Sequence, residues 1–194
     1  MKKVLTSILA ASLLLLGTNA FAQISVGGGY VNSTMVSKAG SSSTTSEPSN
    51  GFYAGIGYTL PIAGDLQLTP GVYYEMLFGK NVKEGYIDVP FHFSYGVYVG
   101  NAKVFAYAGP TVSCGIFSKG SLSILGMTLE GDRYGENSGY GRFDVLLGGG
   151  VGMELNDMIR FNVGYNFGML NRNTSSLDYK LSRNVLTAGV SFLF

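Results

Sequence analysis

The sequence predicts an all-β protein, an eight-stranded antiparallel up-and-down transmembrane β-barrel. Three observations predict it: a strand pattern that runs to the last residue, an N-terminal export signal, and an apolar composition without further long apolar segments. From Arg183 to Phe194, apolar residues occupy every second position, which is the period of a strand with one apolar face. A barrel in lipid would pair both edges of such a terminal strand and cover its apolar face.

The N-terminal segment has the parts of a secretory signal peptide. Two lysines precede an apolar run, Val4 to Leu16, and Ala20-Phe21-Ala22 offers small residues at the cleavage positions. The run is shorter than the roughly 20 residues of a membrane-spanning helix. We therefore expect residues 1–22 to be a signal peptide and residues 23–194 to form one barrel domain.

The composition limits the classes of function. The chain has 29 glycines, 13 tyrosines and 12 phenylalanines but only 13% charged residues, which suits strands that face lipid. Loss of residues 1–22 removes two of the 13 basic residues and leaves 11 beside 12 acidic ones, so nothing favours nucleic-acid binding. The single cysteine, Cys114, cannot form an internal disulfide. We expect no cofactor and no metal site.

Eight segments show strand periodicity. The clearest is Ile159 to Asn171, where an apolar residue alternates with a polar residue or glycine. The other seven lie at about 24–35, 51–61, 66–78, 86–98, 103–117, 141–155 and 181–194. An even number lets an antiparallel barrel close with both chain ends on one side.

The connections between these segments alternate in length. Ile62–Asp65, Gly100–Ala102 and Asn156–Met158 are short, whereas Ser37–Asn50 and Ser118–Tyr140 are long. The remaining two, Gly79–Gly85 and Arg172–Lys180, are intermediate. Outer-membrane barrels place tight turns in the periplasm and longer loops outside, so both termini are expected on the periplasmic side.

The long connection after Ser118 has an internal pattern of its own. Apolar residues flank Gly126 on both sides, which predicts a hairpin that extends the barrel wall: Leu122, Ile124, Met127 and Leu129. Aromatic residues near strand ends predict two interfacial girdles. We place Phe52, Tyr53, Phe78, Tyr86, Phe117 and Tyr140 toward the loops, and Tyr58, Tyr98, Phe161, Phe192 and Phe194 toward the turns.

The alternation also assigns an inward face. The charged residues on it are predicted to form an interior polar plug with His92: Glu75, Asp88, Arg142, Asp144, Glu154 and Arg160. The uncharged polar residues expected with them are Tyr73, Ser94, Asn162 and Asn166. Because an unpaired charge in a closed interior costs several kcal/mol, roughly, opposite charges should meet. We expect Arg142 to pair with Glu75 and Asp144, and Arg160 with Glu154.

His92 and Ser94 are the candidate catalytic pair. They share one strand face, where an imidazole could activate a hydroxyl, and the spacing resembles the His-x-Ser pair of lipid A deacylase barrels. Phe91, Phe93 and Tyr95 take the lipid-facing side, however, which favours a hydrogen-bonded interior histidine. A lipid hydrolase that uses Ser94 and His92 therefore remains one alternative, and a narrow channel another.

Three segments together carry a family resemblance: YIDVPFHFSYGVYV (86–99), KVFAYAGPTVSCGI (103–116) and VLLGGGVGMEL (145–155). With the terminal phenylalanine, they resemble the outer-membrane β-barrel domain family that is often labelled porin-family, similar to the small outer-membrane protein X type. The resemblance implies a barrel in the outer membrane of a gram-negative bacterium, without catalytic residues and without direct support for transport.

The expected role is therefore structural or surface-interacting. Binding would reside in the loops Ser37–Asn50 and Ser118–Tyr140, through which an extracellular ligand could be met. The expected partners are outer-membrane lipid and lipopolysaccharide, and, during biogenesis, the barrel-assembly machinery and periplasmic chaperones.

Overall fold

A computed structural model describes residues 23–124, 127–132, 134, 140–174 and 179–194. The expected signal peptide, residues 1–22, and the expected hairpin tip at Gly126 lie outside the described residues. Within the described part of the chain, no helix has the length and apolarity needed to cross a membrane.

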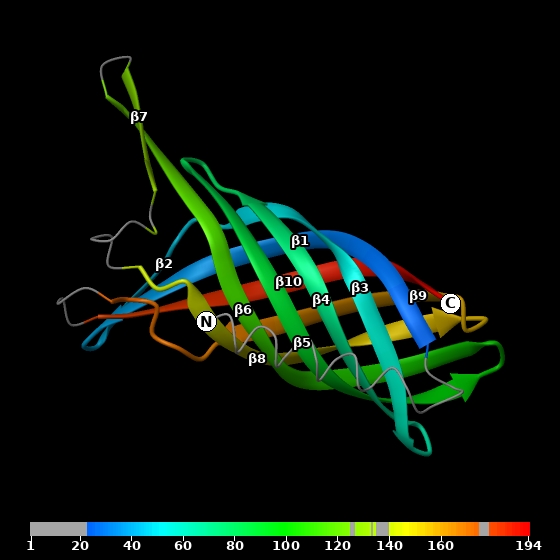
Figure 1. Cartoon of the computed structure of the whole chain (residues 1–194). Coiled ribbons are helices and arrows are strands. Elements are labelled where there is room, and N and C mark those ends of the chain that lie inside the picture. The colour runs from blue at the N-terminus through cyan, green and yellow to red at the C-terminus, as the bar shows by residue number, and fades with distance from the viewer. Residues whose placement is uncertain (1–22, 125–126, 133, 135–139, 175–178) are drawn as a thin grey trace, which may run out of the picture.

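Long antiparallel strands make up the wall of the structure (Figure 1). They are β1 (Gln23–Ala39), β3 (Ser49–Ala63), β4 (Leu66–Phe78), β5 (Val82–Val99), β6 (Ala102–Ile124), β8 (Phe143–Leu155), β9 (Ile159–Gly168) and β10 (Lys180–Leu193). Two shorter strands, β2 (Ser42–Thr45) and β7 (Met127–Asp132), pair with the ends of β1 and β6. The eight expected strands are confirmed, each in its expected place.

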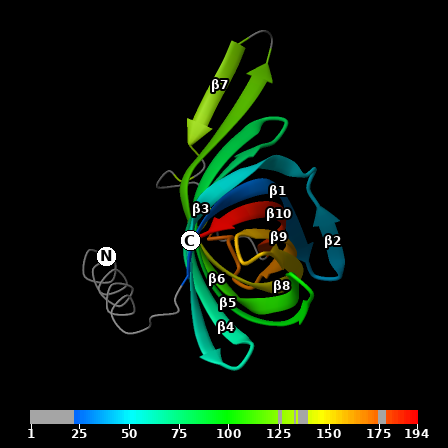
Figure 2. The same ribbon diagram turned by 90° about the vertical axis from the view of Figure 1, so that its right-hand side faces the viewer.

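The ring closes between the first and the last strand. Neighbouring strands pair in the order β10-β9-β8-β6-β5-β4-β3-β1, and β1 pairs in turn with β10. This closing seam runs from Ser25 opposite Leu193 to Lys38 opposite Lys180. The amide of Phe194 still donates to the carbonyl of Ile24 at 2.8 Å, so the chain ends within the hydrogen-bonded wall. Figure 2, which views the end with the short turns, shows the strands around one interior.

The two ends of the barrel differ as the connections predict. At one end, the turn end, the strands β3–β4, β5–β6 and β8–β9 are joined by tight turns. In the last of these turns, Asn156 and Asp157 both have φ of 52°, the left-handed conformation that a two-residue hairpin turn needs and that these residue types tolerate. The opposite end, the loop end, carries the longer connections (Figure 1).

At the loop end, three of the pairings extend further than the alternation predicts. β5 begins at Val82, so its connection to β4 is shorter than the expected Gly79–Gly85. β6 continues to Ile124 and pairs with β7, which confirms the expected hairpin, and β1 pairs with β2 beyond the ring. Backbone pairing continues there because each strand still has a neighbour.

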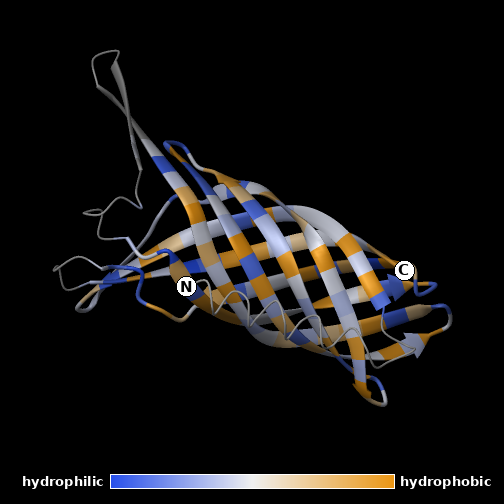
Figure 3. Cartoon of the chain, in the orientation of Figure 1, coloured by the Kyte–Doolittle hydropathy of each residue, from blue (hydrophilic) through white to orange (hydrophobic). Residues whose placement is uncertain are grey.

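The outer surface of the ring is apolar and the interior is polar. On β5, for example, Ile87, Phe93 and Val97 are 41%, 49% and 53% exposed, whereas Asp88 between them is 5% exposed. Figure 3 shows this alternation of hydrophobic and hydrophilic positions along the strands. A wall of this kind is stable where lipid contacts its outer face.

Candidate functional site in the barrel lumen

The lumen is filled with polar side chains, and two arginines are its most buried large residues. Arg172 and Arg183 are both 0% exposed. A buried guanidinium needs charged and hydrogen-bonding partners, because desolvation would otherwise cost several kcal/mol, roughly. The lumen supplies such partners in successive layers between the loop end and the turn end.

Arg183 organises the layer below the loop end. Its Nη1 lies 3.2 Å from Oε2 of Glu75, and its Nη2 lies 3.4 Å from Oδ2 of Asp88. The Ser113 hydroxyl donates to the other oxygen of Asp88 at 2.5 Å. The Arg183 guanidinium also stacks on the ring of Tyr86 at 3.9 Å. Strands β4, β5, β6 and β10 thus meet in one buried network across the lumen.

The predicted pairing of Arg142 with Glu75 and Asp144 is wrong. Arg142 precedes β8, is exposed, and stacks on Tyr134 at 4.8 Å outside the network. The physical reason is that β8 begins only at Phe143, so Arg142 is not held by the strand alternation. Arg183 lies beside Glu75, in the place that was expected for Arg142.

Asp144 does face the interior and is 2% exposed. Its Oδ1 accepts a hydrogen bond from the backbone amide of Leu170 at 3.3 Å, and its Oδ2 has no hydrogen-bond partner. It therefore lies inside the lumen without forming an ion pair with Arg183, whose carboxylate partners are Glu75 and Asp88.

A third ion pair lies near the turn end. Arg160 contacts Glu154 at 2.6 Å, as expected, and donates to the Thr59 hydroxyl at 3.4 Å. The two partners lie directly opposite each other on β8 and β9, which a tight turn connects. Lys103, which the sequence reasoning missed, is 3% exposed on the same side and lies opposite Glu154 on β6.

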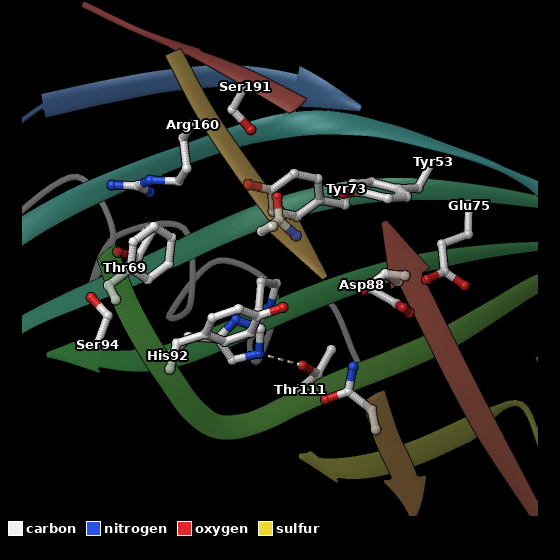
Figure 4. A pocket seen from close by; sticks show the side chains of 16 residues that line it. Tyr53, Thr69, Tyr73, Glu75, Asp88, His92, Ser94, Thr111, Arg160 and Ser191 are labelled. Carbon is white, nitrogen blue, oxygen red and sulfur yellow. Dashed lines mark hydrogen bonds between the residues drawn. The ribbon is translucent and has the colours of Figure 1, made fainter. Parts of the chain in front are cut away.

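Between the two charged layers lies a cavity of about 120 Å³. Tyrosine, asparagine, threonine and histidine side chains line it: Tyr53, Tyr73, His92, Tyr107, Thr111, Asn162, Asn166 and Thr187. Figure 4 shows labelled members of this lining, among them Tyr53, His92 and Thr111, converging from different strands. The side-chain oxygen of Asn166 has no hydrogen-bond partner, although the residue is only 8% exposed.

Glycines on the opposite wall make room for two of the tyrosines. A Cβ on Gly164 would overlap the Tyr107 hydroxyl, and a Cβ on Gly189 would overlap the Tyr53 hydroxyl. Gly164 of β9 and Gly189 of β10 therefore have a packing reason: in a narrow barrel, a large residue on one side needs a position without a side chain on the other.

His92 and Ser94 both line this cavity. His92 Nε2 lies 3.3 Å from the Thr111 hydroxyl, and its ring lies 5.0 Å from that of Tyr107. Ser94 lies on the other side of His92 from Thr111 (Figure 4). The strand wall thus separates both side chains from the lipid-facing surface, and the hydrogen bond of His92 goes to a residue other than Ser94.

Arg172 closes the lumen at the loop end. Its guanidinium donates to the Gly141 carbonyl at 3.0 Å and to the hydroxyls of Tyr86 and Tyr134 at 3.1 and 3.0 Å. It also stacks on the Tyr140 ring at 4.4 Å. We call Arg172, Tyr86, Tyr134, Tyr140 and Gly141 the loop-end cap. Burial is the main cause that raises the pKa of Tyr140 to about 12.

Three of the tyrosines assigned to the girdles are interior residues instead. Tyr53 lines the cavity, Tyr86 is 1% exposed beneath Arg183, and Tyr140 belongs to the loop-end cap. They were expected at the membrane interface because they lie near strand ends. Whether such a residue faces lipid or the lumen depends instead on its odd or even position along the strand. Phe52, Phe78, Phe161 and Phe192 do point outward, with 40–54% exposure.

The alternation of inward and outward positions along β10 could also have identified Arg183 as an interior residue. In the terminal strand, Leu186, Val190 and Phe192 are exposed to the outside, so Arg183 has the opposite parity and faces inward. Arg172 had no such signal because it lies outside the strands. Among the described residues, no group of three or more His, Cys, Asp or Glu side chains could hold a metal ion.

Comparison with known proteins gives a family and a fold. The family model described as "Outer membrane protein beta-barrel domain" matches residues 18–175. No curated protein matches the chain. The structure of the outer membrane enzyme PagL is similar with a TM-score of 0.51 at 13% identity, covering 83% of this chain and 97% of that one.

Two other solved barrels are similar at lower scores. Neisserial surface protein A matches with a TM-score of 0.47 at 13% identity, over 89% of this chain and 97% of that one. Ail, the attachment invasion locus protein of Yersinia pestis, matches with a TM-score of 0.44 at 13% identity, over 89% and 99%.

Proposed function

The chain belongs to the outer membrane protein beta-barrel domain family, and from this premise we propose that it is a surface-interaction protein of the gram-negative outer membrane. Its wall anchors it in the bilayer, its termini and tight turns face the periplasm, and its loop end faces the exterior. Binding is a property of the loops, chiefly residues 37–50 and 118–140.

The observation that carries this proposal is the filled lumen. Arg172 and Arg183 are completely buried across the loop half of the barrel, each held by several partners from different strands or loops. Transport through the barrel would require these contacts to break. A lumen that is packed in this way leaves the loop end as the part of the molecule that can meet a partner.

The β6–β7 hairpin supports this assignment to the loop end. β6 runs beyond its last pairing with β5, between Val82 and Gly120, and then pairs with β7 alone from Ser121 to Ile124. Figure 1 shows this hairpin projecting from the barrel. A projecting two-stranded extension offers a partner a longer stretch of chain than the tight turns at the other end do.

Site-directed labelling on intact cells tests location and orientation together. In a Cys114→Ser background, Ser43→Cys places a thiol on exposed β2 at the loop end, and Asp65→Cys places one in an exposed turn at the other end. A membrane-impermeant maleimide should label Ser43→Cys on whole cells and Asp65→Cys only after the outer membrane is opened. The reverse pattern would overturn the orientation, and no labelling of either variant in outer-membrane fractions would overturn the location.

Loop replacement tests the assigned role. Exchange of residues 41–47 for a short Gly-Ser linker should leave the heat-modifiable gel mobility of the barrel intact, because these residues lie outside the closed ring. Binding of whole cells to an extracellular-matrix or cell surface should fall in that variant, or in one that lacks residues 121–131. Undiminished adhesion in both variants would contradict the proposal.

The alternative functions have their own tests on the same purified protein. A narrow channel would produce discrete conductance steps in planar bilayers, and Arg183→Ala should enlarge them. A lipid hydrolase would release fatty acid from lipid A, and Ser94→Ala would abolish the release. Either result would replace the proposed function.

A further inference from the structure

Two lysines lie directly opposite each other on the outer wall at the loop end. Lys83 of β5 and Lys119 of β6 are paired in register, and both are exposed. Their neighbours Glu84 and Ser118 are also paired, and they meet inside the lumen, where Ser118 donates to Glu84 at 2.9 Å. Because side chains alternate along each strand, Lys83 and Lys119 must point outward.

This arrangement is unfavourable unless an anion occupies it. Side chains directly opposite on antiparallel strands have Cβ atoms about 5 Å apart, and like charges at that spacing repel. Neither lysine forms an ion pair with another described residue. Lys119 lies opposite Asp132 of β7 on its other side, while Lys80, exposed in the β4–β5 turn, adds a third positive charge. The local balance is therefore positive.

The pair also lies just above the lipid-facing band. On the outward face, Ile87 follows Lys83 by four residues, roughly 13 Å along the strand, and is 41% exposed. Phe78 of β4 lies opposite Lys83 and is 40% exposed. A cation directly above an aromatic and aliphatic band lies at the level of lipid headgroups, and a lysine side chain can extend along apolar surface to reach them.

We propose that Lys83 and Lys119 together bind a phosphate group of the phosphorylated glycolipid, lipid A, in the outer leaflet. This proposal rests on the proposed function, because the loop end must face the exterior for the pair to meet that leaflet. One phosphate between the two ammonium groups removes their repulsion and holds a lipid against the β5–β6 wall (Figure 1). The protein thus carries a lipid site on its wall as well as surfaces on its loops.

The chain contains a matched control. Lys38 and Lys180 form a second directly opposite lysine pair at the loop end, between β1 and β10. The next exposed large apolar residue on that outward face is Leu186, six residues from Lys180 and roughly 20 Å along the strand, farther than the roughly 13 Å between Lys83 and Ile87. Half-buried Val36, Thr34, Ser182 and Asn184 occupy the outward positions between them. The second pair has the same register geometry but lies farther from the exposed apolar band than Lys83 and Lys119 do.

Titration of the refolded mature chain in neutral detergent with synthetic lipid A, followed by native mass spectrometry, tests the proposal. Each lysine near an anionic lipid surface contributes about 1 kcal/mol, so Lys83→Ser should weaken lipid A binding about fivefold, and Lys83→Ser with Lys119→Ser about thirtyfold. Lys38→Ser with Lys180→Ser should change binding less than about twofold. Lys83→Arg should retain it.

Three outcomes would overturn the proposal. They are unchanged lipid A affinity in the Lys83/Lys119 double variant, an equal loss in the Lys38/Lys180 double variant, and competition by inorganic phosphate at the same concentration as lipid A. Normal heat-modifiable mobility shows that each variant has folded, and the whole-cell labelling of Ser43→Cys reports orientation separately. Failure of this site is therefore distinguishable from failure of the proposed function.

Discussion

The guanidinium carbon of Arg183 lies 3.9 Å from the ring centre of Tyr86, in the middle of a lumen where Glu75 and Asp88 hold the guanidinium nitrogens. Arg183 is thereby enclosed by an aromatic face and two carboxylates. These partners come from two strands on the side of the ring away from β10. The contact therefore links opposite walls of the barrel.

Removal of Arg183 should strongly destabilise the barrel. Arg183→Met leaves Glu75 and Asp88 buried without their cation, which should lower the free energy of unfolding by about 3–5 kcal/mol. Urea titration in lipid vesicles, with heat-modifiable gel mobility as the readout, measures this loss. Addition of Glu75→Gln and Asp88→Asn should restore most of the stability, and no recovery in the triple variant would show that the arginine acts mainly through packing.

Because Tyr107 packs against Gly164, we predict that position 164 does not tolerate a side chain. Gly164→Ala would place a Cβ in the space of the Tyr107 hydroxyl and should cost about 1–3 kcal/mol of unfolding free energy. Gly131→Ala, where a Cβ would meet no atom within 4 Å, is the control and should be nearly neutral. Tyr107→Phe combined with Gly164→Ala should recover part of the loss in the same urea titration.

The loop-end cap predicts protection of two connections from proteases. Arg172→Ala removes hydrogen bonds to Gly141, Tyr86 and Tyr134 and should lower the free energy of local opening by about 2 kcal/mol. Cleavage between β7 and β8 and between β9 and β10 should then become about thirtyfold faster under native conditions. Mass spectrometry of the fragments measures it. Lys80→Ala, at an exposed residue in the β4–β5 turn, should leave the cleavage rate near that of the parent protein.

Tyr140 predicts a loss of stability at high pH. Its pKa is about 12 in the folded protein and 10 when unperturbed, so the folded state retains the proton more strongly. The raised pKa of Tyr140 adds roughly 2–3 kcal/mol to the free energy of unfolding. This stabilisation is present in full below pH 10 and is lost as the pH rises through 12. Tyr140→Phe, which cannot ionise there, should lose less stability between pH 10 and pH 12. Parallel pH profiles of the two proteins would contradict this.

Local pairs of the lumen follow from the sequence more readily than distant ones. Glu154 and Arg160 are joined through one tight turn, so inward parity and a short connection suffice to bring them together. Arg183 and Glu75 are 108 residues apart, and their contact depends on which strands face each other across the closed ring. The assignment of Arg142 failed for a different reason, because this residue precedes the start of β8 and so lies outside the alternation.

The order of polar and apolar residues by itself determined the all-β class, the eight wall strands, the alternation of tight turns with longer loops and most of the inward set. It did so because a strand repeats every two residues, and lipid outside and a polar interior impose that period directly. Only the tertiary structure decided that Arg183 and Arg172 fill the lumen, that glycines receive Tyr53 and Tyr107, and that His92 meets Thr111. Those contacts depend on the register of the strands and on closure between β1 and β10. Closure brings together side chains from opposite walls, and the distance between such residues along the chain follows no regular period.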